Sequence, residues 1–306
     1  MPDKHQYGPY VRLWGILRSQ LPPEGASAQD LTHFIAPILG EAISFVNTVP
    51  PATAPDVSSG PWKPKGCRSF AHSDAPVQLY ERVVPSAELE AVARDFPVPQ
   101  LQQQRGSRPR AESWVLRRSV HADAPERGTA SWDEWKRYFK EGHAAAELEY
   151  TATVLRTELL ASWDCAGVEV TLGKTTWAGV TLKLEQSVHR MPAPLKNRVF
   201  PVLQVTAEAG DKRIFIVVQI AVVMAGPQQG AGADESGATR GAYTSVEVFI
   251  SQPELAGVEW IMGTVSDAGG LVPAWVQKMA VPGRVAKDVD MFLEWVDRER
   301  KKTNGA

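Results

Sequence analysis

The chain has 306 residues, of which 43% are hydrophobic, and this composition predicts a globular protein with one sizeable core. A formal net charge of −2 argues against nucleic acid as the main partner, because phosphate binding requires a basic surface. The two cysteines lie far apart, so we expect no metal and no cofactor. The opening MPDKHQYGPY has no apolar signal core, and no run of about twenty apolar residues follows, which predicts a soluble, cytoplasmic protein.

The first 65 residues differ in character from the rest of the chain. Residues 31–49 (LTHFIAPILGEAISFVNTV) predict one or two helices with a break near Pro37. The stretch PPATAPDVSSGPWKPKG that follows is typical of a linker. We therefore divide the chain into an N-terminal helical appendage with a linker, residues 1–65, and a main domain, residues 66–306.

The middle of the chain predicts mixed elements. PVQLYERVV (76–84) is expected to be an edge strand and SWVLRRSVH (113–121) a second strand. Ser131 and Glu134 form a capping box that starts a helix. We interpret HAAAELEYTAT (143–153) as a short strand and VLRTELLASWD (154–164) as a helix. On that interpretation His143 and Glu147 need not share a face, and they predict no metal site.

From Gly167 onward the sequence is mostly strands. In WAGVTLKLEQSVH (177–189) apolar and polar residues alternate, which predicts a sheet with one dry and one wet face. The dry face holds Ala178, Val180, Leu182, Leu184 and Val188, and the wet face holds Thr181, Lys183, Glu185, Ser187 and His189. Four further strands are predicted in VFPVLQVTA, IFIVVQIAVVM, YTSVEVFI and VEWIMGTVS.

The last segment predicts a long amphipathic helix. Its apolar stripe consists of Val285, Val289, Phe292, Leu293 and Val296, and Pro282–Gly283 is expected to separate it from the preceding turn PAWVQKMA. An antiparallel sheet with one solvated face must bury its apolar face, and this stripe is the one long enough to cover it. The sequence therefore predicts an α+β fold in which a curled antiparallel sheet grips the C-terminal helix.

The segment HRMPAPLKNRVF (189–200) predicts a stiff corner between two strands. Pro192 and Pro194 restrict the backbone there. The Arg198 guanidinium is suited to bind a carboxylate or backbone carbonyls under the corner, and we favour this structural role over contact with a ligand.

Several of these segments carry a family resemblance. LLASWD, HRMPAPLKNRVF, YTSVEV and GGLVPAWVQKMAVPG resemble landmarks of START-like lipid-transfer domains. Residues 112–298 are similar to a fungal START-like family of unknown function, most specifically in WVLRRSVH, SDAGG and PAWVQK. The resemblance implies a helix-grip fold with a hydrophobic ligand. It implies no reaction, because a fold alone does not fix a function.

The first hypothesis is therefore a non-catalytic binder or carrier of a lipid, sterol or isoprenoid, held in a cavity between the sheet and the C-terminal helix. Transient membrane-surface contact is consistent with the terminal RERKK, although this basic segment is insufficient for stable anchoring. We expect no catalytic residues. The candidate ligand contacts are Trp114, Leu116, Arg118, Val180, Leu182, Leu184, Gln186, Arg198, Trp260, Met262, Trp275, Met279, Val285, Val289 and Phe292.

Two alternatives remain open. A cyclase or isomerase acting on a polyketide-like substrate would need His121, Glu185 or His189 to point inward, whereas the alternation puts Glu185 and His189 on the wet face. A scaffold protein without a cavity would fill the gap with large side chains such as Phe215, Trp260 and Trp275.

Overall fold

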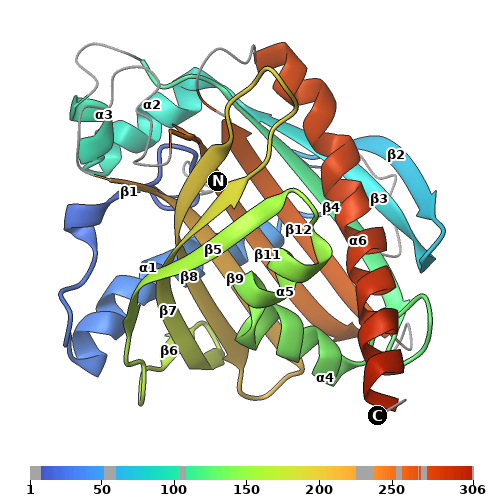
Figure 1. The fold of residues 1–306 in the computed structure, drawn as a ribbon. Coiled ribbons are helices and arrows are strands. Elements are labelled where there is room, and N and C mark those ends of the chain that lie inside the picture. The colour runs from blue at the N-terminus through green and yellow to red at the C-terminus, as the bar shows by residue number, and fades with distance from the viewer. Residues whose placement is uncertain are drawn as a thin grey trace.

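The computed structural model describes residues 8–51, 60–103, 108–224, 237–252, 257–267, 269 and 274–304. Its centre is one large, curled sheet, with the C-terminal helix α6 (Ala274–Asn304) lying across one face (Figure 1). Nine strands form the main path of the sheet, and each is antiparallel to its neighbours. Their order is β2 (Lys63–Phe70), β3 (Ser73–Val84), β4 (Glu112–Ala122), β12 (Gly257–Asp267), β11 (Ala242–Gln252), β9 (Ile214–Val223), β8 (Arg198–Ala209), β7 (Thr175–His189) and β5 (Val154–Trp163). This is the predicted α+β helix-grip arrangement.

Three short strands extend the sheet, and several helices surround it. β1 (Ile16–Leu17) pairs with β9, β6 (Val170–Leu172) with β7, and β10 (Thr239–Arg240) with β8. The helices before α6 are α1 (Ala28–Val46), α2 (Ser86–Asp95), α3 (Pro99–Gln103), α4 (Trp132–Trp135) and α5 (His143–Tyr150), with a 3-10 turn at Arg18–Gln20 and a π-helix, η2, at Lys136–Glu141.

One face of the sheet packs against α1, and we call it the α1 face. Strand register places Leu182, Val205, Val218, Val246 and Leu116 in one row on it. This row shares a core with the apolar side of α1, from Leu31 to Phe45. Gly263 belongs to the same row, and a Cβ there would lie 2.4 Å from the Phe45 ring, so the absence of a side chain lets α1 approach.

The opposite face, which we call the α6 face, packs against α6 and η2. Phe215, Phe249 and Trp260 form a second core there with Phe292 of α6 and Trp135 at the end of α4. Both faces of the sheet are therefore covered. The prediction that the dry face of β7 meets the C-terminal helix is wrong, because α1 covers that face and α6 packs on the opposite face of the sheet, over β3 and β4.

Four local predictions are also corrected. Residues 143–150 form α5 and residues 154–163 form β5, so strand and helix are exchanged. Strand β3 is not at the edge, because β2 covers its outer side. α1 continues through Pro37, and α6 continues through Pro282–Gly283, because a helix this long can lose one backbone hydrogen bond at a proline.

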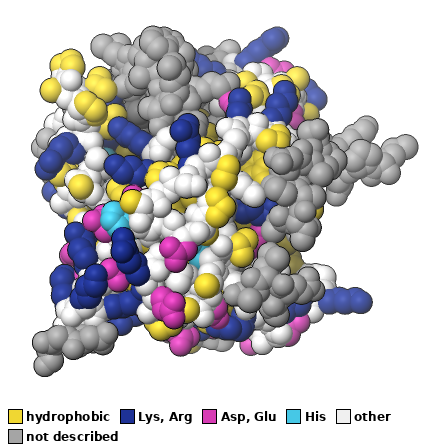
Figure 2. Space-filling model, turned by 90° about the vertical axis from the view of Figure 1, so that its right-hand side faces the viewer, with side chains coloured by type: hydrophobic (Ala, Val, Ile, Leu, Met, Phe, Trp, Pro, Cys, Tyr) yellow, Lys and Arg dark blue, Asp and Glu magenta, His cyan; other side chains and the backbone are white. Residues whose placement is uncertain are grey.

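The end of α6 is fixed to the start of α4. The predicted capping box is present: the Ser131 side chain accepts a hydrogen bond from the Glu134 amide, and the Glu134 carboxylate accepts one from Ser131. The same carboxylate receives two bonds from the Arg300 guanidinium, at 2.6 and 2.7 Å. Acidic and basic side chains are intermixed on this side of the molecule (Figure 2), in keeping with a net charge near zero.

Candidate functional site

A group of buried side chains with polar contacts lies on the α6 face, and we call it the Glu247 cluster. Its members are Glu247, Arg117, Trp260 and His143. Register pairs Glu247 of β11 with Met262 of β12, and Met262 with Arg117 of β4, so all three belong to one row. Trp260 Nε1 donates to Glu247 Oε2 at 2.9 Å, and His143 Nε2 lies 3.7 Å from Glu247 Oε1. The Arg117 guanidinium stacks 3.6 Å from the Trp260 ring centroid, with Nη2 4.0 Å from Glu247.

The Glu247 cluster places a buried carboxylate beside the Arg117 guanidinium and the His143 imidazole. Burial opposes the charge on Glu247, but contact with His143 and the charge of Arg117 outweigh it and lower the pKa of Glu247. Burial likewise disfavours protonated His143, yet the neighbouring Glu247 raises the pKa of His143. Among the described residues, nothing forms a hydrogen bond with Nε and Nη1 of Arg117 or with Nδ1 of His143. Buried donors of this kind are expensive to leave unsatisfied.

Six partly accessible titratable residues interact electrostatically with the Glu247 cluster or with one another, and we call them the outer ring. Burial, followed by carboxylates that include Glu147 and Glu247, raises the pKa of Tyr150 and Tyr243 well above the ordinary value. Burial also raises the pKa of Glu185, and it raises that of Asp288 to about 7 even though Arg117 acts in the opposite direction. The members of the outer ring are Glu147 and Tyr150 of α5, Glu185 and His189 of β7, Tyr243 of β11 and Asp288 of α6.

The outer ring combines two properties. Burial shifts the pKa of Tyr150, Glu185, His189, Tyr243 and Asp288, yet each of these residues keeps some accessible surface. Side chains at a convex surface do not show this combination, because water solvates them. It is typical of side chains that border an enclosed or cleft-like space.

Sequence reasoning missed most of this site. It placed His143 and Glu147 on a strand, whereas α5 carries them one turn apart and brings both toward Glu185. It placed Glu185 and His189 on a solvated face, whereas burial there raises the pKa of Glu185 and lowers that of His189. The i, i+4 spacing of His143 and Glu147 was the available signal, and assigning a helix there would have used it.

The predicted contact residues divide between the two faces. Trp114, Leu116, Val180, Leu182 and Leu184 lie on the α1 face, inside the core shared with α1. Two polar candidates also lie on that face. Arg118 bonds to Glu259 and the Pro50 carbonyl, and Gln186 donates to Glu158 at 2.9 Å.

The remaining candidates lie nearer α6. Trp260 and Met262 are on the α6 face, and Val285, Val289 and Phe292 are buried residues of α6. Arg198 donates to the backbone carbonyls of Lys196 and Gly269, which is the predicted structural contact. The side chains of Trp275 and Met279 lie outside the described residues. Ligand contact by any of these candidates stays a prediction.

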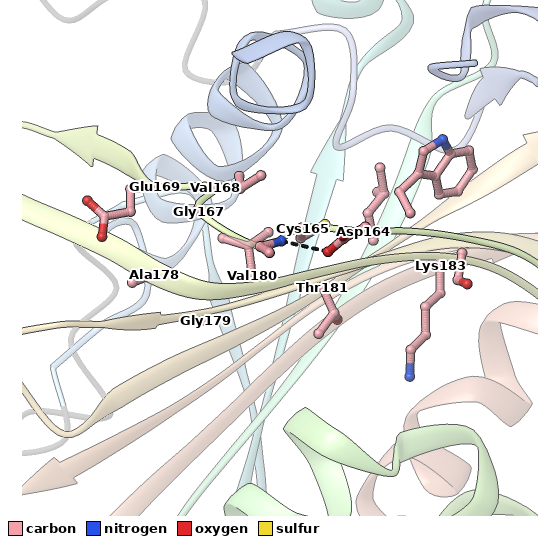
Figure 3. Close-up of a pocket in the computed structure, with 14 residues that line it drawn as sticks. Asp164, Cys165, Gly167, Val168, Glu169, Ala178, Gly179, Val180, Thr181 and Lys183 are labelled. Carbon is pink, nitrogen blue, oxygen red and sulfur yellow. Dashed lines mark hydrogen bonds between the residues drawn. The ribbon is translucent and has the colours of Figure 1, made fainter. Parts of the chain in front are cut away.

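A separate pocket of about 540 Å³ lies at the edge of the sheet between β5 and β7 (Figure 3). Residues 162–169 and 178–183 line it, with Val180 on the opposite side of β7 from Thr181 and Lys183. It is distinct from the Glu247 cluster, none of whose residues border it.

The described residues lack two further features. In this part of the chain, no helix combines the length and the apolar character needed to cross a membrane. Nor do His, Cys, Asp or Glu side chains gather there in threes in a way suited to a metal ion.

Comparison with known proteins defines the class of fold. The crystal structure of human STARD10 superposes with a TM-score of 0.53 at 13% identity, covering 87% of this chain and 82% of that one. Human StAR-related lipid transfer protein 5 superposes with a TM-score of 0.52, also at 13% identity, covering 89% and 99% respectively. The fold is therefore START-like.

The sequence then defines the family. Residues 114–296 match the family described as protein of unknown function DUF3074, and the chain belongs to this family. No curated protein sequence matches the chain. The predicted membership of a START-like family of unknown function is confirmed, and its fungal origin stays a prediction.

Proposed function

We propose that the protein binds a hydrophobic small molecule, of the lipid, sterol or isoprenoid type, in an internal space between the α6 face, α5 and α6. The observation that carries the proposal is the outer ring, in which burial shifts the pKa of five side chains that nevertheless keep some accessible surface. The helix-grip fold supports the proposal, since a protein with the same fold, human StAR-related lipid transfer protein 5, is named for lipid transfer. Removing apolar ligand surface from water would supply roughly 25 cal/mol per Å².

Met262 provides the test of where the ligand lies. It belongs to the α6 face between Arg117 and Glu247 and keeps some accessible surface. Met262→Trp adds bulk to the proposed space, and we expect it to lower uptake of a fluorescent acyl lipid by about tenfold or more. Val83→Trp is the matched control, because Val83 is a strand residue with 53% exposure.

The two variants should be compared at equal thermal stability of the fold. Full lipid uptake by a folded Met262→Trp protein would contradict the proposed position of the ligand. Loss of uptake in the Val83→Trp protein would show that the assay reports a general effect of added tryptophan.

A second candidate is an enzyme that moves protons on its ligand, such as a cyclase or isomerase. The observation that favours it is that Glu185 and His189 lie on the α6 face, together with a pKa of about 7 for Asp288. A group with a pKa near 7 is suited to general acid–base chemistry at neutral pH. Mass spectrometry of polyketide-like compounds before and after incubation tests it. Conversion that is lost in Asp288→Asn would support the enzyme.

We also propose that lipid exchange uses surface contact with a membrane near α5 and β5. Leu148, Leu155 and Leu159 are exposed there by 36%, 38% and 57%. Apolar side chains at an interface add binding free energy in proportion to buried area. This cluster supports membrane contact more directly than the basic C-terminus does.

A further inference from the structure

β5 is the last strand on one side of the sheet, and in the described part of the chain no strand pairs with its outer edge. Such an edge leaves backbone N–H and C=O groups free to pair with another chain, and proteins commonly block it with Lys or Pro. β5 contains neither of these residues, and its side chains Leu155 and Leu159 are 38% and 57% exposed. This edge is therefore open to pairing with a further strand.

The middle of β5 is the part that can pair regularly. Arg156 to Leu159 lie opposite residues 188 to 185 of β7 in an uninterrupted register. Register shifts lie on both sides of this run, between Val154 and Arg156 and between Leu159 and Ala161. A strand added outside β5 would pair over this short run, which predicts a small and reversible contact.

The charges in this run have a symmetry that favours a second copy of the same strand. The sequence LRTEL (155–159) keeps its leucines and exchanges its two charges when it is reversed. Arg156 and Glu158 are both exposed, and because they are two residues apart they project from the same face of the sheet. Glu158 accepts a hydrogen bond from Gln186 Nε2 at 2.9 Å, and no carboxylate of the described residues forms an ion pair with Arg156.

These charges select the register of the pairing. A two-fold dimer of antiparallel strands is centred on one residue when the faces of the two sheets match. A centre at Arg156 puts two guanidinium groups opposite each other, and a centre at Glu158 puts two carboxylates there. A centre at Thr157 pairs Arg156 of each copy with Glu158 of the other, so that two opposite-charge pairs form. The same register brings Leu159 of one copy close to Leu155 of the other.

We propose that two copies of the chain form a dimer by antiparallel pairing of β5 with β5, centred on Thr157, so that their sheets join at this edge. The dimer covers Leu155 and Leu159, which are two of the three leucines proposed above for membrane contact. A second copy and a membrane therefore compete for the same strand, and membrane contact belongs to the monomer. The dimer does not depend on which ligand the protein binds, or on whether it binds one.

Sedimentation equilibrium of the intact protein, between about 1 and about 200 µM, measures the association. A contact this short predicts a dissociation constant of about 1–100 µM. Arg156→Glu and Glu158→Arg each place like charges opposite each other at both pairs, so we expect either change to weaken association by about tenfold or more. Lys174→Glu is the control and should leave association unchanged, because Lys174 is exposed in the turn between β6 and β7.

A mixture of the two single variants is the sharpest test of the register. In a heterodimer of the Arg156→Glu and Glu158→Arg proteins, each pair again joins a carboxylate to a guanidinium. We therefore expect equal amounts of the two variants to associate about as tightly as wild type, although neither associates alone at the same concentration. Two chains that had merely failed to fold would not complement each other in this way.

Three outcomes would overturn the dimer. The first is a wild-type protein that stays monomeric up to about 200 µM. The second is a mixture of the two variants that stays monomeric while wild type dimerises, because the interface would then lie elsewhere. The third is a monomeric wild type whose binding to phosphatidylcholine vesicles falls with Leu159→Ser, because the edge would then serve membrane contact alone.

Discussion

At the scale of single residues, burial shifts the pKa of ionisable side chains, and His121 is an example. His121 is 2% exposed, lies beside Trp135 and Trp260, and contacts Ser119 Oγ at 2.8 Å. Burial, with a smaller contribution from the charge of Arg117, lowers the pKa of His121 to about 3. The histidine is therefore neutral in the folded protein, and in the unfolded chain it takes up a proton near its ordinary pKa of 6.5.

His121 predicts a loss of stability in acid. Because its folded pKa lies below the unfolded value, the unfolded state binds the proton first, and stability falls as pH drops below about 6.5. The contribution of this group is at most about 1.4 kcal/mol per pH unit. His121→Phe removes the titration, so its unfolding free energy should fall less steeply than that of wild type between about pH 6 and about pH 4.

Urea unfolding at several pH values measures this slope. His33→Phe is the control, because His33 is exposed and the substitution is the same. An identical slope for wild type and His121→Phe would contradict a buried, neutral histidine.

At the scale of elements, Arg300 fixes the C-terminal end of α6 to the elements beside it. Arg300 bonds to both oxygens of Glu134 and also to the carbonyls of Glu126 and Thr129. Both side chains of the Arg300–Glu134 ion pair are largely buried. One residue thus ties the end of α6 to α4 and to the turn after β4.

Arg300→Met should release this end of α6. The loss of charge-assisted bonds to a largely buried carboxylate is expected to cost about 1–3 kcal/mol of unfolding free energy. It should also speed amide exchange in the last turns of α6. Lys302→Met removes an exposed helical ion pair and should cost about 0.5 kcal/mol or less. Equal effects of the two substitutions would contradict the structural role of Arg300.

The elements also show how far sequence reasoning reached. The alternation in β7 correctly predicted a strand with two different faces, and the helical spacing after residue 283 correctly predicted α6. Alternation does not state which layer covers which face, however, and α1 and α6 both carry apolar stripes. Residues 143–164 were assigned the wrong way round because β5 contains three Leu residues with one Arg, one Glu and one Ala, all of which favour a helix. Pairing with β7 overrides that helical preference.

The candidate site was less accessible to sequence reasoning than the fold. Its residues come from β4, β7, β11, α5 and α6, which are separated along the chain by up to about half its length. Glu185 was named only for the enzyme alternative, and Glu247 and Asp288 were not singled out. Their roles depend on strand register and on the position of α6, which no local pattern specifies. The division at residue 65 stays a prediction.

At the scale of the whole molecule, the sheet separates two different interiors. Where it packs against α1, the α1 face is an apolar core, and the buried Arg118–Glu259 ion pair lies on the same face. The α6 face combines an aromatic core with the Glu247 cluster and the outer ring. A chain that needed only stability could cover both faces with apolar side chains, since buried ion pairs contribute little net stability. The polar side is therefore where we expect function.

Native mass spectrometry of the gently purified protein, followed by extraction and identification of the bound molecule, tests the central claim most directly. The account predicts one hydrophobic small molecule per chain, of the lipid, sterol or isoprenoid type. The mass of the bare chain, together with no uptake of fluorescent lipid from vesicles, would contradict ligand binding and favour a scaffold protein with a filled core.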